Sequence, residues 1–175
     1  MHVVLKLAKG LPRLRAKRPY KVLRACFAKG CDRFGFRLVH YSVQGDHLHL
    51  IVEAKDRKAL SSGMGGLAIR IARGLNRLWE RRGKVFADRY YDHILRTPLE
   101  VKRALAYVFN NRDKHRVYEQ GRDEIGIFSS GMWFDGWRGM SVKEIDFKVP
   151  PPLARARTWL LNTGWRRHGL LSLAG

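Results

Sequence analysis

The sequence predicts an α+β fold in which helices cover one face of a mainly antiparallel sheet. Short β-rich apolar segments alternate along the chain with longer segments whose apolar residues recur at helical spacing. Their order is strand, helix, strand, strand, helix, strand, helix. The chain has 175 residues, 45% of them hydrophobic, which is enough for one domain with a substantial core.

The first half of the chain should form a strand, a helix, a hairpin and a second helix. HVVLKL is β-rich, and the basic segment 11–19 is broken by two prolines and is expected to be a loop. Helical spacing over 20–34 predicts a helix that Gly35 would end. FRLVHYSVQ and HLHLIVE would be the two arms of a hairpin, turning at Gly45 and Asp46. Residues 56–82 again have helical spacing, and SSGMGG is expected to break them into a loop and a longer helix.

The second half contains one more strand and the clearest helix start. KVFADRYYDHILR predicts a strand with an irregularity near Asp88. In TPLE, Thr97 is suited to the N-cap, Pro98 to the first helical position, and Glu100 lies three residues past the cap. This capping box predicts a helix that contains ALAYVFNN and ends near His115.

The composition changes beyond about residue 117. SSGMWFDGWRG and KVPPPLARART are rich in Gly, Pro, Trp and Arg, and TWLLNTGWRRHG is expected to be a short basic helix. We interpret residues 1–116 as the main domain and residues 117–175 as a basic, Trp-rich C-terminal extension packed on it.

The charge points to nucleic acid. Lys and Arg number 35 against 15 Asp and Glu, a formal net charge of +20, and a polyanion is the natural partner for such an excess. The basic loop is expected to contact phosphate through Arg13, Arg15, Lys17 and Arg18. Trp133 and Trp137 could stack on unpaired bases or pack against the domain, whereas packing is favoured for Trp159.

The sequence also argues against other classes of protein. No apolar run reaches the ~18–20 residues that span a bilayer, and the N-terminus lacks the pattern of a signal peptide. Cys26 and Cys31 have a C-x₄-C spacing that matches no common zinc ligand pair. We therefore expect a protein of the reducing cytoplasm without a membrane partner.

QGDHLHLIVE places two histidines at alternate positions of a strand. His47, His49 and Ile51 should share one face, while the residues between them form an apolar opposite face. The pair could be packed in the core, or it could bind a divalent cation that takes a third ligand from elsewhere. By itself the pair leaves both readings open.

The helix that starts at TPLE offers a nucleophile. Tyr107 and Asn111 are four residues apart and so share a helical face, which Arg103 and Lys114 flank. A phenol can attack a phosphodiester and exchange one ester bond for another, so the reaction needs no nucleotide cofactor. A divalent ion held by two imidazoles and an amide would polarise the phosphate.

These motifs resemble a known family over residues 3–116. The H-x-H strand is similar to the HUH motif of single-tyrosine transposases, and GKVFADRYYDHILRTPLEVKRALAYVFNN resembles the later half of the REP-associated tyrosine transposases. The resemblance implies a ferredoxin-like fold, with His47 and His49 as metal ligands, Tyr107 as nucleophile and Asn111 in place of the third ligand. It also implies nicking and strand transfer of single-stranded DNA beside a hairpin through a 5′-phosphotyrosine, with Mg²⁺ or Mn²⁺, by a monomer or a homodimer.

Two positions depart from the family pattern. Many members have Asn-Pro after the tyrosine, where this chain has Asn111 and Arg112, and many have Asn directly before the first histidine, where this chain has Asp46. We favour a turn role for Asp46 over a role as an outer partner of a metal ligand. Two other functions stay open: a non-catalytic nucleic-acid-binding protein, and phosphodiester hydrolysis by metal-activated water.

Overall fold

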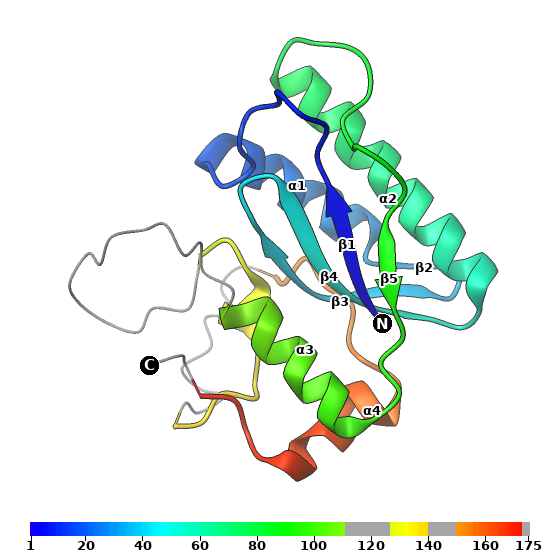
Figure 1. Ribbon diagram of the computed structural model, residues 1–175, viewed down its shortest axis with the longest axis vertical. Coiled ribbons are helices and arrows are strands. Elements are labelled where there is room, and N and C mark those ends of the chain that lie inside the picture. The colour runs from blue at the N-terminus through cyan, green and yellow to red at the C-terminus, as the bar shows by residue number, and fades with distance from the viewer. Residues whose placement is uncertain (111–126, 140–149, 173–175) are drawn as a thin grey trace.

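Five strands form one antiparallel sheet in the order β2-β3-β4-β1-β5. The computed structural model describes residues 1–110, 127–139 and 150–172. β1 lies between β4 and β5, which gives the strand arrangement of ferredoxin-like folds, so the predicted α+β class is confirmed (Figure 1). The strands are β1 (His2–Lys6), β2 (Asp32–Arg33), β3 (Phe36–Val43), β4 (His47–Ala54) and β5 (Tyr91–His93).

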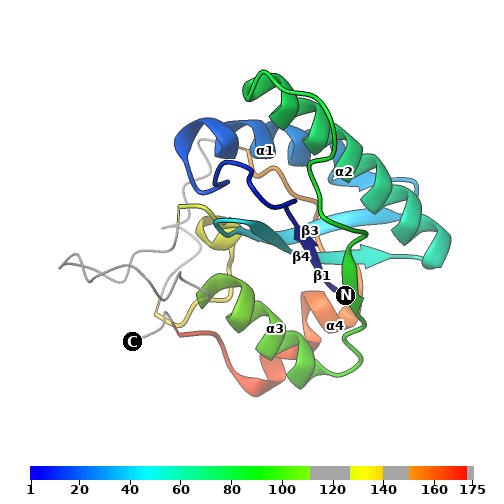
Figure 2. The ribbon, with the colours of Figure 1, turned by 45° about the horizontal axis from the view of Figure 1, so that its top comes forward.

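Helices cover both faces of the sheet, so the expectation of a single covered face is wrong. The long helices α1 (Lys17–Gly30) and α2 (Arg57–Leu78) lie on one face, and α3 (Pro98–Asn110) and α4 (Trp159–Asn162) lie on the other (Figure 2). The strands permit this because both faces are apolar at their centre. In β4, Leu48 and Leu50 are buried on the α1–α2 side, whereas Ile51 is buried on the α3 side.

The two hydrophobic cores have different origins along the chain. The larger core lies between the sheet and α1 and α2. The smaller core joins α3 to segments that follow it in sequence, and its buried side chains are Val39, Ile51, Val101, Ala104, Leu105, Val108, Phe109, Phe134, Trp137, Leu161, Trp165 and Leu171. The helix that carries Tyr107 is therefore held in place largely by residues beyond 130.

Two helices differ from the predicted ones. α1 begins earlier, at Lys17, because Pro19 is tolerated in a first turn, and it ends at Gly30. Gly35 instead follows Phe34 in the β2–β3 turn, with φ of +83°. α2 runs unbroken through SSGMGG, and Gly63 is needed there because a Cβ atom would lie 2.2 Å from Cγ of Phe36.

The link from α2 to α3 is mostly irregular. Only Tyr91–His93 pairs as a strand, along β1, while Phe86 forms an isolated bridge with Leu7. The predicted cap of α3 is present, since the Glu100 amide donates to Oγ1 of Thr97 at 3.2 Å. The Glu100 carboxylate accepts from the backbone amide of Arg96, one residue before the cap.

The described C-terminal segments contribute to both faces of the sheet: Trp133 joins the larger core, whereas Phe134, Trp137, Leu161, Trp165 and Leu171 pack in the smaller core with α3. Buried Glu53 accepts hydrogen bonds from the amides of Arg157 and Thr158 and from Oγ1 of Thr158, and it pairs with Arg37 at 2.9 Å. The expected single basic helix is instead α4 followed by a 3₁₀ turn over Gly164–His168. The boundary proposed near 116 lies outside the described residues, and so does the expected end of α3 at His115.

Candidate active site

His47 and His49 begin β4 and project on the α3 side of the sheet. The ring of His47 is partly exposed and that of His49 is buried, and their Nε2 atoms are 3.0 Å apart. Alternation along the strand sets this approach, because residues two apart point to the same face. The shared face predicted from the sequence is therefore present.

Each ring has a partner for its other nitrogen. Nδ1 of His47 is 2.7 Å from Oδ1 of Asp46, and Nδ1 of His49 is 3.1 Å from Nε2 of His2. Asp46 is a turn residue too, because its carbonyl accepts from the amide of Leu7 at 2.8 Å. Asp46 is thus a turn residue, as expected, and its carboxylate also contacts His47.

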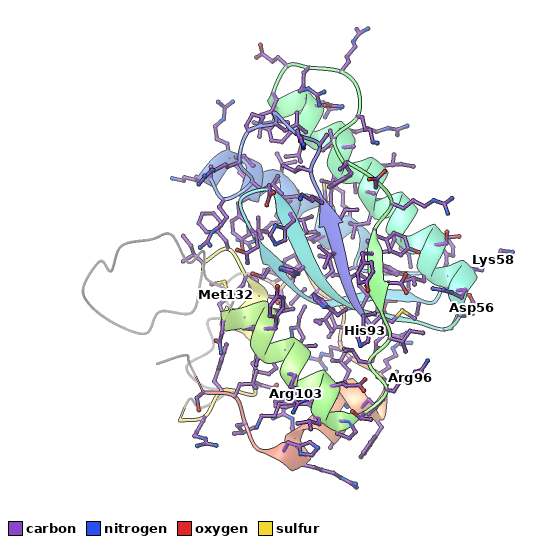
Figure 3. The ribbon with its side chains drawn as sticks, in the orientation of Figure 1. Asp56, Lys58, His93, Arg96, Arg103 and Met132 are labelled. Atoms are coloured by element: carbon purple, nitrogen blue, oxygen red, sulfur yellow. The ribbon has the colours of Figure 1, made fainter. Side chains whose placement is uncertain are left out.

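Tyr107 lies against this histidine cluster. The centroid of its ring is 5.1 Å from that of His49 and 5.8 Å from that of His2, both with edge-to-face geometry. Leu105 and Phe109 point from α3 into the smaller core. Tyr107 lies on a neighbouring face of the helix and is 52% exposed. Arg103, one turn earlier, is exposed on α3 (Figure 3), while Asn111 and Lys114 lie outside the described residues.

Two of the histidines are neutral near pH 7. Burial, followed by the charges of His47 and His2, lowers the pKa of His49 to about 3. Burial, followed by the charges of the chain's amino terminus and His93, lowers the pKa of His2 to about 4. The hydrogen bond from His47 holds the pKa of Asp46 below its usual value, so that carboxylate is ionised. Neutral imidazoles are the form that binds metals.

The spacing of the two imidazoles fits a shared divalent cation. Two nitrogens that each lie ~2.1 Å from one ion and subtend a right angle are ~3.0 Å apart, which is the separation of the two Nε2 atoms. Within the described parts of the chain, no three His, Cys, Asp or Glu side chains gather so that they could hold an ion. A third ligand would have to come from an amide, DNA, water or a residue outside these parts.

The basic loop before α1 lies beside the start of β4. Leu14 is fully buried, and its amide donates to the carbonyl of Gly45 at 2.8 Å, which fixes the loop to the turn before His47. Arg13, Lys17 and Arg18 are exposed. Arg15 is half-buried, with its guanidinium 5.3 Å from the ring centroid of Phe128.

The tryptophans that could stack on bases are buried, and the one expected to pack is half exposed. Trp133 and Trp137 are only 8% and 2% exposed, and Nε1 of Trp137 donates to the carbonyl of Gly131. Buried rings cannot stack on bases, so these two residues pack the cores. Trp159, for which packing was expected, is 50% exposed and lies under the guanidinium of Arg167.

A second basic surface was missed in the sequence. A groove of about 440 Å³ between α1 and α2 is lined by Lys29, Arg70, Arg73 and Arg77. None of the four has an ion-pair partner among the residues that the structure describes. The three arginines recur three and four residues apart, so they share one face of α2. This spacing is visible in the sequence, but only the apolar residues of the segment were used, to predict a helix.

Comparisons with known proteins give the family and a likeness of fold. A family model described as "Transposase IS200 like" matches residues 1–111. A solved structure described as "Structure of the REP associates tyrosine transposase bound to a REP hairpin" is similar with a TM-score of 0.58. That match has 19% identity over 90% of this chain and 92% of that chain, which is a likeness of fold. No curated protein matches, and no described helix is long and apolar enough to cross a membrane.

Proposed function

Because the chain belongs to the IS200-like transposase family, we propose that it nicks and rejoins single-stranded DNA beside a hairpin through a covalent bond to Tyr107. The observation that carries this proposal is the contact between the Tyr107 ring and His49, at 5.1 Å between centroids. A phenol and a pair of metal-competent imidazoles thus lie together on one side of the sheet.

The reaction exchanges one ester for another. The phenolic oxygen of Tyr107 attacks the phosphorus, the bond to the 3′ oxygen breaks, and the 3′ oxygen leaves as a hydroxyl after taking a proton. The phosphate stays on the tyrosine as a 5′-phosphotyrosine, so the number of phosphodiester bonds does not change and no nucleotide is consumed. In the second half, a 3′-hydroxyl attacks the phosphotyrosine and restores the phenol.

His47 and His49 would hold the divalent ion, with the amide of Asn111 as the proposed third ligand. When bound, Mg²⁺ or Mn²⁺ supplies a positive centre that polarises the scissile phosphate. Asp46 and the turn around it hold His47 with Nε2 directed toward His49. Nitrogen ligands suit Mn²⁺ better than the oxygen-preferring Mg²⁺, so Mn²⁺ is the stronger probe.

The basic surfaces suggest where the DNA runs. The related solved structure is described as bound to a REP hairpin, and we propose that this chain also takes a hairpin. The loop with Arg13 borders the turn before His47, and Lys17 and Arg18 follow it in the first turn of α1; these three residues would contact phosphates next to the cleaved bond. The groove between α1 and α2 carries four further cations on the opposite face of the sheet, where it would hold the backbone of a stem.

A covalent-adduct assay tests the proposal. A single-stranded hairpin substrate that carries its label on the 3′ side of the cleaved bond, with Mn²⁺, should give a denaturation-resistant protein–DNA adduct, which disappears in Tyr107→Phe and falls strongly in His47→Ala. Tyr91→Phe is the matched control, because Tyr91 is an exposed tyrosine on the same sheet face, opposite Val4.

The assay also separates the competing functions. An adduct that persists in Tyr107→Phe refutes the assignment of the nucleophile. Free 5′-phosphate ends without an adduct would show hydrolysis by water, and binding with neither product would show a non-catalytic protein.

A further inference from the structure

His2 lies beside both His49 of the candidate metal site and the candidate nucleophile Tyr107. Its Nε2 is 3.1 Å from Nδ1 of His49, and its ring is 5.8 Å from that of Tyr107. The pairing of β1 explains the position: His2 is directly opposite Ile51 on β4, so His49 is its diagonal neighbour on the same face. No motif in the sequence singles out this residue.

Hydrogen-bond complementarity orders the protons along the cluster. The ionised Asp46 carboxylate can only accept, so His47 donates from Nδ1. One proton can lie between the two Nε2 atoms, which are 3.0 Å apart. If Nε2 of His49 carries this proton, Nδ1 of His49 has a lone pair and accepts a hydrogen bond from Nε2 of His2. If Nε2 of His47 carries the proton instead, His49 is protonated on Nδ1 and donates to Nε2 of His2.

A cation at the Nε2 pair takes the place of the proton between the two rings and leaves His49 protonated on Nδ1. With both Nε2 lone pairs directed at one ion, neutral His49 must carry its proton on Nδ1, where it needs an acceptor. Nε2 of His2 lies within hydrogen-bond distance of that nitrogen, at 3.1 Å. An imidazole serves in both arrangements because it can donate or accept, whereas a carboxylate only accepts and an ammonium only donates.

We propose that His2 is a positioning residue for the metal site: it accepts from Nδ1 of His49 and thereby holds the Nε2 lone pair of His49 toward the ion. The inference rests on the proposed function, since it assigns His49 as a ligand. It adds a residue from the first strand to a site otherwise made by β4 and α3. Loss of such an outer partner typically weakens metal binding 10–100-fold.

The test measures metal binding without DNA. Mn²⁺ affinity is determined by calorimetry for the wild type, His2→Phe and His2→Gln. Phe keeps a flat ring against Tyr107 but cannot accept, while the Gln amide can donate or accept as imidazole does. We expect an affinity loss of roughly 10–100-fold in His2→Phe and recovery to within a few-fold of the wild type in His2→Gln.

The matched control is His93→Phe. His93 is directly opposite His2 on β5 and is exposed on the same face (Figure 3). The substitution His93→Phe therefore removes an imidazole from the same face without a change at His2 or His49, and it should leave the Mn²⁺ affinity unchanged. A second readout follows the proton: in ¹⁵N-histidine NMR with Mg²⁺, His49 should be protonated on Nδ1 in the wild type and in His2→Gln. Folding of each variant is checked by circular dichroism, and His2→Met replaces His2→Phe if the latter does not fold.

The outcomes distinguish this inference from the proposed function. Wild-type affinity in His2→Phe, or an equal loss in His93→Phe, overturns the role of His2 while the adduct assay still stands. A wild type that binds no Mn²⁺ overturns both proposals. Saturating Mn²⁺ should also restore adduct formation in His2→Phe, because the defect is in metal affinity; a deficit that persists at saturation would overturn the positioning role.

Discussion

Gly63 and Gly65, two residues apart on α2, should respond in opposite directions to replacement by alanine. A methyl group added at Gly63 would lie 2.2 Å from Cγ and 2.5 Å from Cβ of Phe36, on the strand beneath. A methyl group added at Gly65 would meet no atom within 4 Å. Both residues lie inside one continuous helix, so the two substitutions share the change in helix propensity and differ in packing.

The magnitudes follow from these contacts. Gly→Ala in a helix interior favours folding by about 1 kcal/mol, so Gly65→Ala should raise the free energy of unfolding by about that amount. Gly63→Ala gains the same propensity but overpacks Phe36, which costs about 1–3 kcal/mol or more in a close-packed core. The two variants should therefore differ by about 1–3 kcal/mol, or roughly 2–4 °C in Tm per kcal/mol for a chain of this size.

Urea denaturation followed by circular dichroism measures both variants against the wild type. The reasoning is refuted if Gly65→Ala does not stabilise, because that result would mean that SSGMGG is not helical in solution. It is equally refuted if the two variants have the same midpoint, because then Phe36 does not constrain Gly63.

Three further predictions concern the carboxylate, the histidines and the groove. Glu53→Gln should lower the free energy of unfolding by about 3–5 kcal/mol, since it breaks a buried ion pair; a urea-measured loss below about 1 kcal/mol would contradict this. Without metal, stability should fall as pH drops from about 6.5 toward 4, because unfolded chains take up a proton that folded His49, with its pKa of about 3, does not. For this group the free energy of unfolding changes by at most about 1.4 kcal/mol per pH unit. Urea midpoints of His49→Phe should depend less steeply on pH than those of the wild type, and an equal dependence would count against the lowered pKa of His49. Arg70→Ala with Arg73→Ala should reduce the salt slope of hairpin affinity by up to about 1.8, whereas Lys58→Ala, outside the groove at the start of α2 (Figure 3), should not; equal slopes would remove the groove from the DNA path.

The sequence predicted the fold class because the periodicities of strands and helices were local and strong. HLHLIVE and TPLE specify a strand and a capped helix within a few residues, and both are present. SSGMGG was mispredicted as a break because glycine is a poor helix former, whereas the structure requires a small residue against Phe36. That requirement arises from packing between elements far apart in sequence, which no local pattern reveals.

The candidate site was predictable only in part, for the same reason. Alternation places His47 and His49 together, but the approach of His2 depends on the pairing of β1 with β4, which the sequence does not specify. The sequence left Trp133 and Trp137 open between stacking and packing, and it misassigned Trp159, because a Trp among arginines is equally consistent with stacking and with burial. Only the packing of Phe134, Trp137 and Trp165 into the smaller core distinguishes the two.

The order in which the residues of the smaller core are synthesised affects when the candidate site can form. α3 is described as far as Asn110, and much of the apolar surface that buries it comes from residues later in the chain: Phe134, Trp137, Leu161, Trp165 and Leu171. A chain that has left the ribosome only as far as α2 already contains most of the larger core, but α3 still lacks the side chains that hold it against the histidines. Tyr107 is therefore the last part of the candidate site to be fixed in place, and an unfinished chain presents His47 and His49 before Tyr107 is held beside them.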